Sequence, residues 1–376
     1  MRTAIISDLH LGSAHGEDVL RDAAIRRLLV NEIQEADRVV LLGDVLELRE
    51  VPLPVALETA RPLFEELGRA LGKKPVVLIP GNHDHRLAEP LLEQLAISER
   101  TSLGLEHNGP PLGGATQQMA SWLGEADLTI SYPGIWLRED VYATHGHYMD
   151  CHMSLPRIEC IAAAALMRSG DRPPDPATTA DYERILRPVY GLAFGIAQSG
   201  LRASAARPSE RIWRSLNGEK ESSNSGAIRR KLRTAVGRAG VEVGAPAAVW
   251  TLNRLLHADF SAVLSPAAIT QSGIDAASEM ARRLRIEAAH VITGHTHRGG
   301  PEEADAEWLL PGGGRLHNTG NWVFSSAFHR PGTPPSPYWP GTVTWVEEEG
   351  APRRTRLLME HGYAEMRTIA SEARPS

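Results

Sequence analysis

Short apolar runs alternate with amphipathic stretches along the first 145 residues of this 376-residue chain. Five of the runs are typical of β-strands, namely Thr3–Ser7, Val39–Leu42, Val76–Ile79, Leu128–Ser131 and Val141–Thr144. Two stretches between them, Asp18–Ile33 and Leu53–Leu71, carry apolar residues at helical spacing. Charged residues are nearly absent inside the strands, as is typical of strands that are covered on both faces. The alternation therefore predicts an α/β layered fold.

The pattern changes between about Met149 and Arg285, where the chain is rich in Ala, Arg, Leu and Ser and is expected to form helices joined by breaks. Further strands are predicted at His290–Thr293, Arg315–Asn318, Trp322–Ser325, Thr342–Glu347 and Arg356–Met359. The simplest account is one α/β domain, residues 1–148 and 288–363, interrupted by a basic helical insertion at residues 149–287. Residues 364–376 are expected to form a frayed tail.

Polar segments follow five of the predicted strands, at the point where each strand ends and a loop begins. They are Asp8-Leu9-His10, Gly43-Asp44, Gly81-Asn82-His83-Asp84, His145-Gly146-His147 and Gly294-His295-Thr296-His297. Any one of them alone has an ordinary explanation as a capping residue, a turn or a solvated imidazole. Together they favour oxygen and imidazole ligands gathered at the strand ends of one sheet. Such a set of ligands suits a pair of divalent metal ions.

The order of these segments resembles that of the calcineurin-like metallophosphoesterase superfamily: D-x-H, G-D-x-x-E, G-N-H-D, H-G-H and G-H-T-H. The resemblance covers residues 1–147 and about 288–325. It implies a four-layer α/β/β/α sandwich, with two facing sheets flanked by helices and the helical insertion as a cap. It also implies two metal sites, one formed by Asp8, His10 and His297 and the other by Asn82, His145 and His295, with Asp44 bridging them.

The resemblance further implies a reaction, the hydrolysis of a phosphodiester, phosphomonoester or pyrophosphate by a hydroxide that bridges the two metals. Carboxylate, imidazole and carboxamide ligands favour Mn²⁺, with Fe or Zn²⁺ as alternatives. His83 would act as the general acid at the leaving-group oxygen, and Glu47 would orient it. A carboxylate beside an imidazole favours the protonated form that a general acid needs.

Residues beside the five segments are further candidates. His147 is expected either to lie behind the metal ligands or to contact the substrate. Arg86 and Arg298 could bind phosphate oxygens through two hydrogen bonds, although an arginine in a loop is more often simply solvated. Asp84 is expected to stabilise its own loop, and the glycines of the segments are expected to allow positive φ or a close backbone approach to the metals.

The insertion carries an excess of positive charge. Between Arg184 and Arg238 there are twelve Lys and Arg residues and three acidic ones, whereas the whole chain has a net charge of -6. This predicts contact with an anion: an anionic phosphoester substrate, an anionic membrane surface to which the protein would bind peripherally, or an acidic partner. The apolar segment Ile185–Leu201 is expected either to form an amphipathic face for lipid or to pack as an ordinary helix pair. A solvated arginine-rich surface is the alternative.

A second resemblance bears on the substrate. The D-L-H-L opening, the G-H-T-H-R block and the helical lid resemble UDP-diacylglucosamine pyrophosphatases, which cleave a lipid-linked nucleotide diphosphate. The chain departs from them, since it has G-N-H-D and H-G-H where that group would have G-N-R-D and H-G-D. A lipid-linked nucleotide pyrophosphatase and a nuclease are the alternative enzymes, and a metal-binding scaffold without catalysis is the non-enzyme alternative. The negative net charge and the 5% aromatic content argue against dedicated nucleic-acid binding.

Cysteine usage and hydropathy predict a cytoplasmic protein. Cys151 and Cys160 do not form a C-x-x-C pair, so neither a disulfide framework nor a structural zinc site is indicated. No signal peptide is predicted before the first strand, and no run approaches the roughly 18 apolar residues of a membrane span. No particular oligomeric state is predicted.

Overall fold

The computed structural model of the chain describes residues 1–98, 103–168, 172–199, 245–261, 263, 265–333 and 335–372. The strands are β1 (Thr3–Ile6), β2 (Arg38–Leu42), β3 (Pro75–Ile79), β4 (His107–Gly109), β5 (Asp127–Tyr132), β6 (Gly134–Arg138), β7 (Val141–Thr144), β8 (His290–Thr293), β9 (Arg315–Asn318), β10 (Thr342–Val346) and β11 (Arg353–Arg356). The α-helices are α1 (Ala23–Ile33), α2 (Leu53–Leu71), α3 (Glu89–Ile97), α4 (Gly114–Leu123), α5 (Ile158–Met167), α6 (Thr179–Gln198), α9 (Ala245–Leu256), α10 (Pro266–Arg283) and α11 (Tyr363–Glu372).

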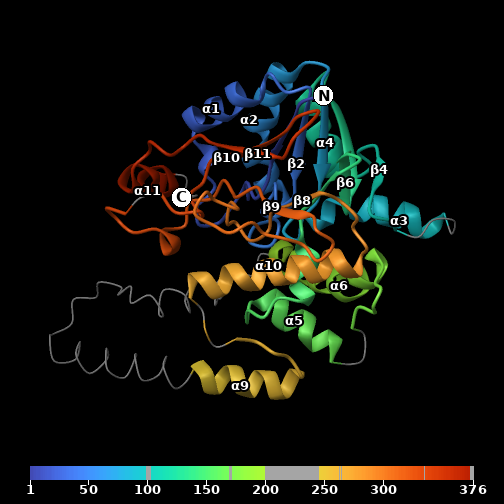
Figure 1. Cartoon of the computed structure of the whole chain (residues 1–376). Helices are drawn as coiled ribbons and strands as arrows, with labels where there is room; N and C mark the ends of the chain where they lie inside the picture. The colour runs from blue at the N-terminus through green and yellow to red at the C-terminus, as the bar shows by residue number, and fades with distance from the viewer. Residues whose placement is uncertain are drawn as a thin grey trace.

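Two β-sheets form the centre of the molecule (Figure 1). The larger sheet has seven strands in the order β11-β10-β1-β2-β3-β5-β4, and β1, β2, β3 and β5 run parallel to one another. The smaller sheet has four strands in the order β6-β7-β8-β9, of which β7, β8 and β9 are parallel. Parallel strands end at the same edge of a sheet, so the loops after β1, β2 and β3 lie together, as do those after β7 and β8.

Successive residues of the central strands face opposite layers. Ala4 and Ile6 of β1 belong to the buried cluster that also contains Leu29 of α1 and Phe64 of α2. Ile5, between them, belongs to the cluster that fills the space between the two sheets. Because side chains alternate across a strand, a strand that is covered on both faces must be apolar at every position. This arrangement accounts for the near absence of charge in the predicted strands.

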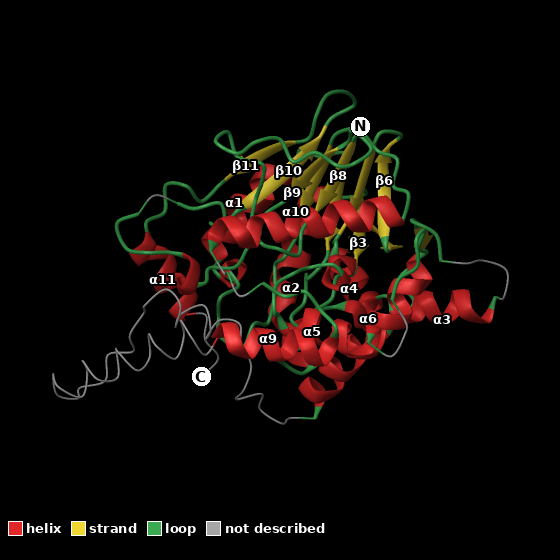
Figure 2. Ribbon diagram, turned by 60° about the horizontal axis from the view of Figure 1, so that its bottom comes forward, coloured by secondary structure: helices red, strands yellow, loops and turns green. Residues whose placement is uncertain are grey.

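Helices of the predicted insertion cover the outer face of the smaller sheet. Val291 of β8 and Leu316 of β9 share one buried cluster with Leu186 of α6 and Met280 of α10. Figure 2 shows α10 crossing in front of these strands. The layers are therefore helix, sheet, sheet and helix, which is the α/β/β/α sandwich expected from the sequence. Helix α10 precedes residue 287 and packs on the sandwich. The insertion boundary at residue 287 stays a prediction.

The helix predicted at Asp18–Ile33 begins in two steps. A short 3-10 helix, η1, spans Val19–Arg21, and α1 starts only after Asp22. The carboxylate of Asp22 accepts hydrogen bonds from the backbone amides of the second and third residues of α1, at 2.8 and 3.0 Å. An aspartate that caps a helix in this way holds its own backbone outside it, so the helix cannot extend back to Asp18.

The strand predicted at Trp322–Ser325 is wrong. Val323 makes only an isolated bridge to Asp18. The apolar run instead serves to bury Trp322, whose backbone amide donates to the Asp8 carbonyl at 3.0 Å and whose indole N–H donates to the Thr342 carbonyl at 3.0 Å. A buried apolar run can thus be a packed loop that supports the end of β1.

The C-terminal predictions also need correction. The strand expected at Arg356–Met359 lies three residues earlier as β11, and a turn follows it. The tail expected at residues 364–376 is wrong over its described part, because α11 continues to Glu372. Met366 of this helix is fully buried in the cluster beneath α1 and α2. Burial of one face anchors the helix to the domain, which an isolated ten-residue segment could not achieve alone.

Much of the predicted basic stretch at Arg184–Arg238 lies outside the described residues, which resume at residue 245 after residue 199. The described part of Ile185–Leu201 lies in α6, which contains Pro188 and runs on as one helix to Gln198. Over the parts of the chain that the structure describes, none of the helices has both the length and the apolar character needed to cross a membrane.

Candidate metal centre

The loops after β1, β2 and β3 are joined by backbone hydrogen bonds. The amides of Asp8 and His10 donate to the carbonyls of Gly43 and Asp44, at 3.0 and 2.8 Å. The buried carboxylate of Asp84 accepts from the amides of Gly81 and Val45, both at 2.7 Å. Asp84 therefore stabilises these loops, as predicted.

The loops after β7 and β8 are joined in the same way. The amide of Gly294 donates to the carbonyl of His145 at 3.1 Å, and the Asn318 side chain at the end of β9 donates to the Gly294 carbonyl at 2.6 Å. Asn321 donates from its side chain to the carbonyl of His297 at 2.7 Å. These hydrogen bonds fix the backbone that carries the histidines after β7 and β8.

Backbone strain is concentrated at these loop ends. Five non-glycine residues of the segments have φ between 45° and 68°, in the left-handed region: Asp8, His10, Asp44, His295 and His297. Such conformations cost about 1–3 kcal/mol each and persist where the surrounding structure holds them, most often at functional sites. Gly43 has φ 83°, and a Cβ atom there would lie 2.3 Å from the His145 ring. Only glycine allows this approach.

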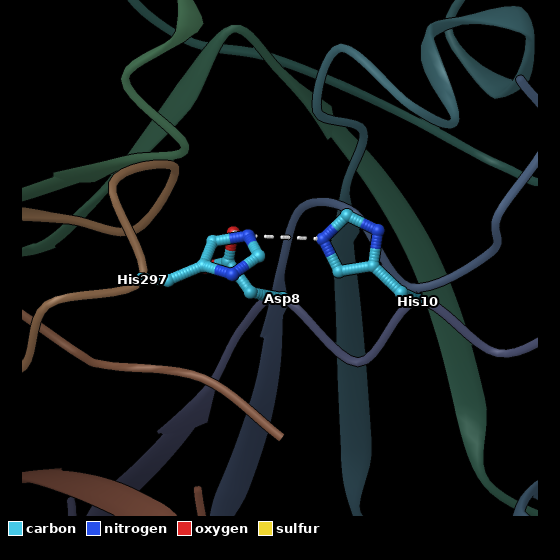
Figure 3. Close-up of side chains that lie close together, drawn as sticks. All are labelled: Asp8, His10 and His297. Atoms are coloured by element: carbon cyan, nitrogen blue, oxygen red, sulfur yellow. Dashed lines mark hydrogen bonds and ion pairs between the residues drawn. The ribbon is translucent and has the colours of Figure 1, made fainter. Parts of the chain in front are cut away.

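Asp8, His10 and His297 point toward one another (Figure 3). The Nε2 atom of His297 lies 3.1 Å from His10 Nε2 and 3.3 Å from Asp8 Oδ1. His10 donates from Nδ1 to Glu47 Oε2 at 2.9 Å, so in its neutral form its Nε2 atom is an acceptor. Acceptor atoms therefore converge on one point, and a cation there would satisfy all of them.

Asp44, His145 and His295 form a second group. His145 donates from Nδ1 to the Leu42 carbonyl at 2.9 Å, which leaves its Nε2 atom as an acceptor 3.2 Å from Asp44 Oδ2. His295 Nε2 lies 2.8 Å from the Asp150 carboxylate, and its Nδ1 atom faces Asn82. Asp44 Oδ2 also lies 3.7 Å from His10 Nε2, so this single carboxylate reaches both groups.

The amide of Asn82 can take two orientations. With Oδ1 inward, the oxygen lies 3.1 Å from His295 Nδ1 and 3.3 Å from His145 Nε2. With the amide turned over, its NH₂ group donates to these atoms and to Asp44, and its oxygen accepts from Arg49. A cation between the imidazoles favours the first orientation, because it needs an oxygen ligand. All seven residues predicted as ligands are thus brought together, with donor atoms that suit Mn²⁺, Fe or Zn²⁺.

The buried carboxylates of the site favour positive charge beside them. Burial alone would raise the pKa of Asp44, but His145 and His83 hold it well below its usual value. Burial alone would lower the pKa of His10, but the hydrogen bond to Glu47 and the charge of Asp44 raise it to about 9. Burial is likewise overcome at His145, where Asp44 raises the pKa to about 10. These groups favour bound protons or, in their place, bound cations.

Glu47 holds two imidazoles with one oxygen atom. Its Oε2 accepts from His83 Nδ1 at 2.7 Å and from His10 Nδ1 at 2.9 Å. The pairing of Glu47 with His83 expected from the sequence is present, and the contact to His10 adds to it. Glu47 is buried, whereas 19% of the His83 side chain is exposed. The Nε2 atom of His83, which lies 3.3 Å from Arg49 Nη1, is therefore held at the solvent-facing side of the site.

The weaker candidates lie apart from this arrangement. His147 is buried behind the ligands, 3.0 Å from the Tyr132 hydroxyl, where burial and the nearby His145 hold its pKa well below the usual value. Arg298 donates two hydrogen bonds to Asp305, at 2.8 and 2.9 Å, so its guanidinium is engaged away from the metal-binding residues. Arg86 lies over the ring of Phe194 at 5.8 Å.

The sequence reasoning missed Asp150, Arg49 and Glu159. Asp150 holds His295, and Arg49 reaches His83 and donates to Glu159 at 2.5 Å. Asp150 and Arg49 stand close to segments that were recognised, five residues after His145 and two residues after Glu47. Because a carboxylate or guanidinium near a loop is usually solvated, only their burial separates them from surface residues.

Residues 1–179 match the calcineurin-like phosphoesterase family. The match includes four of the five polar segments, and His295 and His297 of the fifth complete the cluster in space. Residues 1–179 are therefore similar to calcineurin-like phosphoesterases. Curated relatives match a shorter stretch: UDP-2,3-diacylglucosamine hydrolase of Shewanella baltica is 40% identical over 92 residues, which are 24% of this chain and 35% of that protein.

A second relative, UDP-2,3-diacylglucosamine hydrolase of Shewanella oneidensis, is 36% identical over 96 residues, 25% of this chain and 37% of that protein. The chain thus spans about a third of the length of the curated relatives that it matches. Among solved structures, a cold-active protein-tyrosine phosphatase of a psychrophilic Shewanella species is 13% identical and covers 94% of this chain and 80% of its own, with a TM-score of 0.27. That TM-score is too low to support an argument about the fold.

Proposed function

We propose that this metallophosphoesterase uses two divalent metal ions, Mn²⁺ in preference to Fe or Zn²⁺, to hydrolyse a phosphodiester, phosphomonoester or pyrophosphate. The observation that carries the proposal is the position of Asp44, whose Oδ2 atom faces His145 at 3.2 Å and His10 at 3.7 Å. One ion would be held by Asp8, His10 and His297 and the other by Asn82, His145 and His295. Asp44 would bridge the two ions.

Each part of the site has a chemical role. The metal ions would polarise a phosphoryl oxygen and make a nucleophilic water available near neutral pH. The carboxylates keep the site anionic, so that it attracts cations. His83 would donate a proton from Nε2 to the leaving-group oxygen, and Glu47 would fix the ring through Nδ1.

The bridging role is tested with Asp44→Asn in purified protein supplied with Mn²⁺. We expect hydrolysis of a chromogenic phosphodiester to be lost, because an amide cannot supply an anionic oxygen to each of two metals. The fold should be kept, with an unchanged circular dichroism spectrum. Unchanged turnover by the folded variant would refute the proposal.

The general-acid role is tested with His83→Ala and esters of different leaving groups. A leaving group of high pKa needs protonation, whereas nitrophenolate does not. We expect the variant to lose about 10²–10⁴-fold in kcat on the poor leaving groups, the usual range for general acid catalysis, and much less on nitrophenyl esters. Equal losses on both classes of ester would argue against a proton-donating His83.

A second candidate activity is cleavage of a lipid-linked nucleotide diphosphate at a membrane surface. The similarity to proteins named UDP-2,3-diacylglucosamine hydrolase favours it. The His83 of this chain, where that group would have arginine, weighs against the same substrate. A comparison of kcat/KM on a detergent-solubilised UDP-linked lipid and on small phosphodiesters separates the two activities.

A further inference from the structure

Side chains at the proposed metal centre differ sharply in accessibility. Asp8, Asp44 and His145 are fully or almost fully buried, whereas 29% of the His297 side chain and 19% of the His83 side chain are exposed. A substrate must therefore approach from the side of His83 and His297. Residues that bind it should stand at this rim.

Arg49 stands at the rim beside His83. Its Nη1 atom lies 3.3 Å from His83 Nε2, and 15% of its side chain is exposed. When Asn82 Oδ1 faces the metals, its NH₂ group lies 2.9 Å from the same Nη1 atom. The N–H groups of Arg49 and Asn82 then face the same point beside His83. Converging N–H groups form a binding site for an anionic oxygen.

The guanidinium of Arg49 is anchored from the other side. Its Nη2 atom donates to Glu159 Oε1 at 2.5 Å, so Nη1 remains directed at the rim. Arg157 stands at the other carboxylate oxygen, with Nε 3.9 Å from Glu159 Oε2 and with 30% of its side chain exposed. Because two arginines surround one glutamate, this group of three side chains has a net positive charge, and it lies next to His83. Arg157 and Glu159 come from the start of the predicted insertion, and Arg49 comes from the loop after β2.

We propose that Arg49 is a substrate-binding residue that donates from Nη1 to a phosphoryl oxygen of the substrate, with Glu159 as its positioning residue and Arg157 as a second cation. This proposal rests on the proposed phosphoesterase function and adds a recognition element to it. It assigns phosphate binding to residues contributed jointly by the sandwich and the insertion. The two arginines suggested by the sequence, Arg86 and Arg298, would not take this role.

The proposal is tested with Arg49→Lys, Arg49→Ala and Arg157→Ala, with Arg61→Ala as the control. Arg61 pairs with Glu65 on the exposed face of α2, and its loss removes an arginine–glutamate pair remote from the site. For each variant we would measure kcat and KM on a chromogenic phosphoester, inhibition by inorganic phosphate, bound Mn²⁺ and the melting temperature.

A charge-assisted hydrogen bond contributes an amount that corresponds to about 10- to 100-fold in affinity. We expect Arg49→Ala to weaken phosphate inhibition and to raise KM by about that factor, with Mn²⁺ content unchanged. Arg49→Lys should recover only part, since a single ammonium replaces a guanidinium that holds Glu159 and phosphate together. Arg157→Ala should show a smaller effect, and Arg61→Ala none.

Wild-type phosphate inhibition in folded Arg49→Lys and Arg157→Ala protein would overturn the proposal. A loss of Mn²⁺ in Arg49→Ala with unchanged KM in Arg49→Lys would also overturn it, because it would make Arg49 a support of the metal site. If the wild-type protein itself hydrolyses no phosphoester, the proposed function fails instead, and phosphate binding measured by calorimetry on the Mn²⁺-loaded protein still decides the role of Arg49.

Discussion

Replacement of Asp150 by asparagine should weaken one of the two proposed metal sites and spare the other. The Asp150 carboxylate accepts from His295 Nε2 at 2.8 Å, on the side of the ring opposite to Asn82. Its other oxygen, Oδ2, has no hydrogen-bond partner among the described residues. The hydrogen bond from His295 to Asp150 fixes the imidazole ring and would make its Nδ1 atom a stronger metal ligand.

The loss of metal affinity depends on which interactions with His295 each substitution at position 150 retains. The side-chain amide introduced by Asp150→Asn could still accept from His295 Nε2 but would lack the negative charge, whereas Asp150→Ala would lose both. Removing such a partner of a ligating histidine costs about 10- to 100-fold in metal affinity. We therefore expect about tenfold weaker binding for Asp150→Asn and about 100-fold for Asp150→Ala, at the site of His295 only.

Calorimetric titration with Mn²⁺ can resolve the two sites. Asp140→Asn is a matched control, since Asp140 is an exposed carboxylate paired with Arg138 and remote from the cluster. Wild-type affinity at both sites in Asp150→Ala would refute the reasoning. Equal weakening of both sites in a fully folded variant would show that Asp150 supports the whole centre rather than His295.

Three other perturbations test separate parts of the structure. Gly43→Ala should abolish Mn²⁺ binding, because its Cβ would lie 2.3 Å from the His145 ring, and normal binding would show that the backbone can yield. Apparent Mn²⁺ affinity should rise with pH between 6 and 8, by up to about tenfold per unit for each proton displaced from His10 (pKa about 9) and His145 (pKa about 10), and a flat profile would contradict these values. Met366→Ala should lower the free energy of unfolding by about 2–5 kcal/mol in chemical denaturation without changing metal content, and an unchanged stability would show that α11 is not anchored.

The central strands and the proposed ligands could be predicted because both depend on local sequence. Strands covered on both faces leave uncharged apolar runs, as at Val39–Leu42 in β2 and Val76–Ile79 in β3, and the proposed ligands at strand ends follow those runs directly. The helix at Leu53–Leu71 was predicted with its observed bounds, since its apolar face has a clear helical period. These parts of the fold can be recognised from the pattern of apolar and polar residues in a short stretch of sequence.

Features that depend on distant contacts could not be predicted. Trp322–Ser325 is as apolar as a strand, but the position of Asp8 and Thr342 decides that it is a loop. The helix α11 exists because Met366 finds a place in the core, which no pattern within the last residues reveals. Asp150 and Arg49 resemble surface residues in sequence, and only the fold brings them to His295 and His83.

The proposed function depends most on two metal ions that share Asp44 and act together. The most direct test is to add Mn²⁺ stepwise to metal-free protein and to measure bound metal and phosphodiesterase activity in the same samples. We predict two bound ions per chain, with activity that rises as the second ion binds and with neither result in Asp44→Asn. Full activity with one ion, or two bound ions without turnover of any phosphoester, would contradict the account.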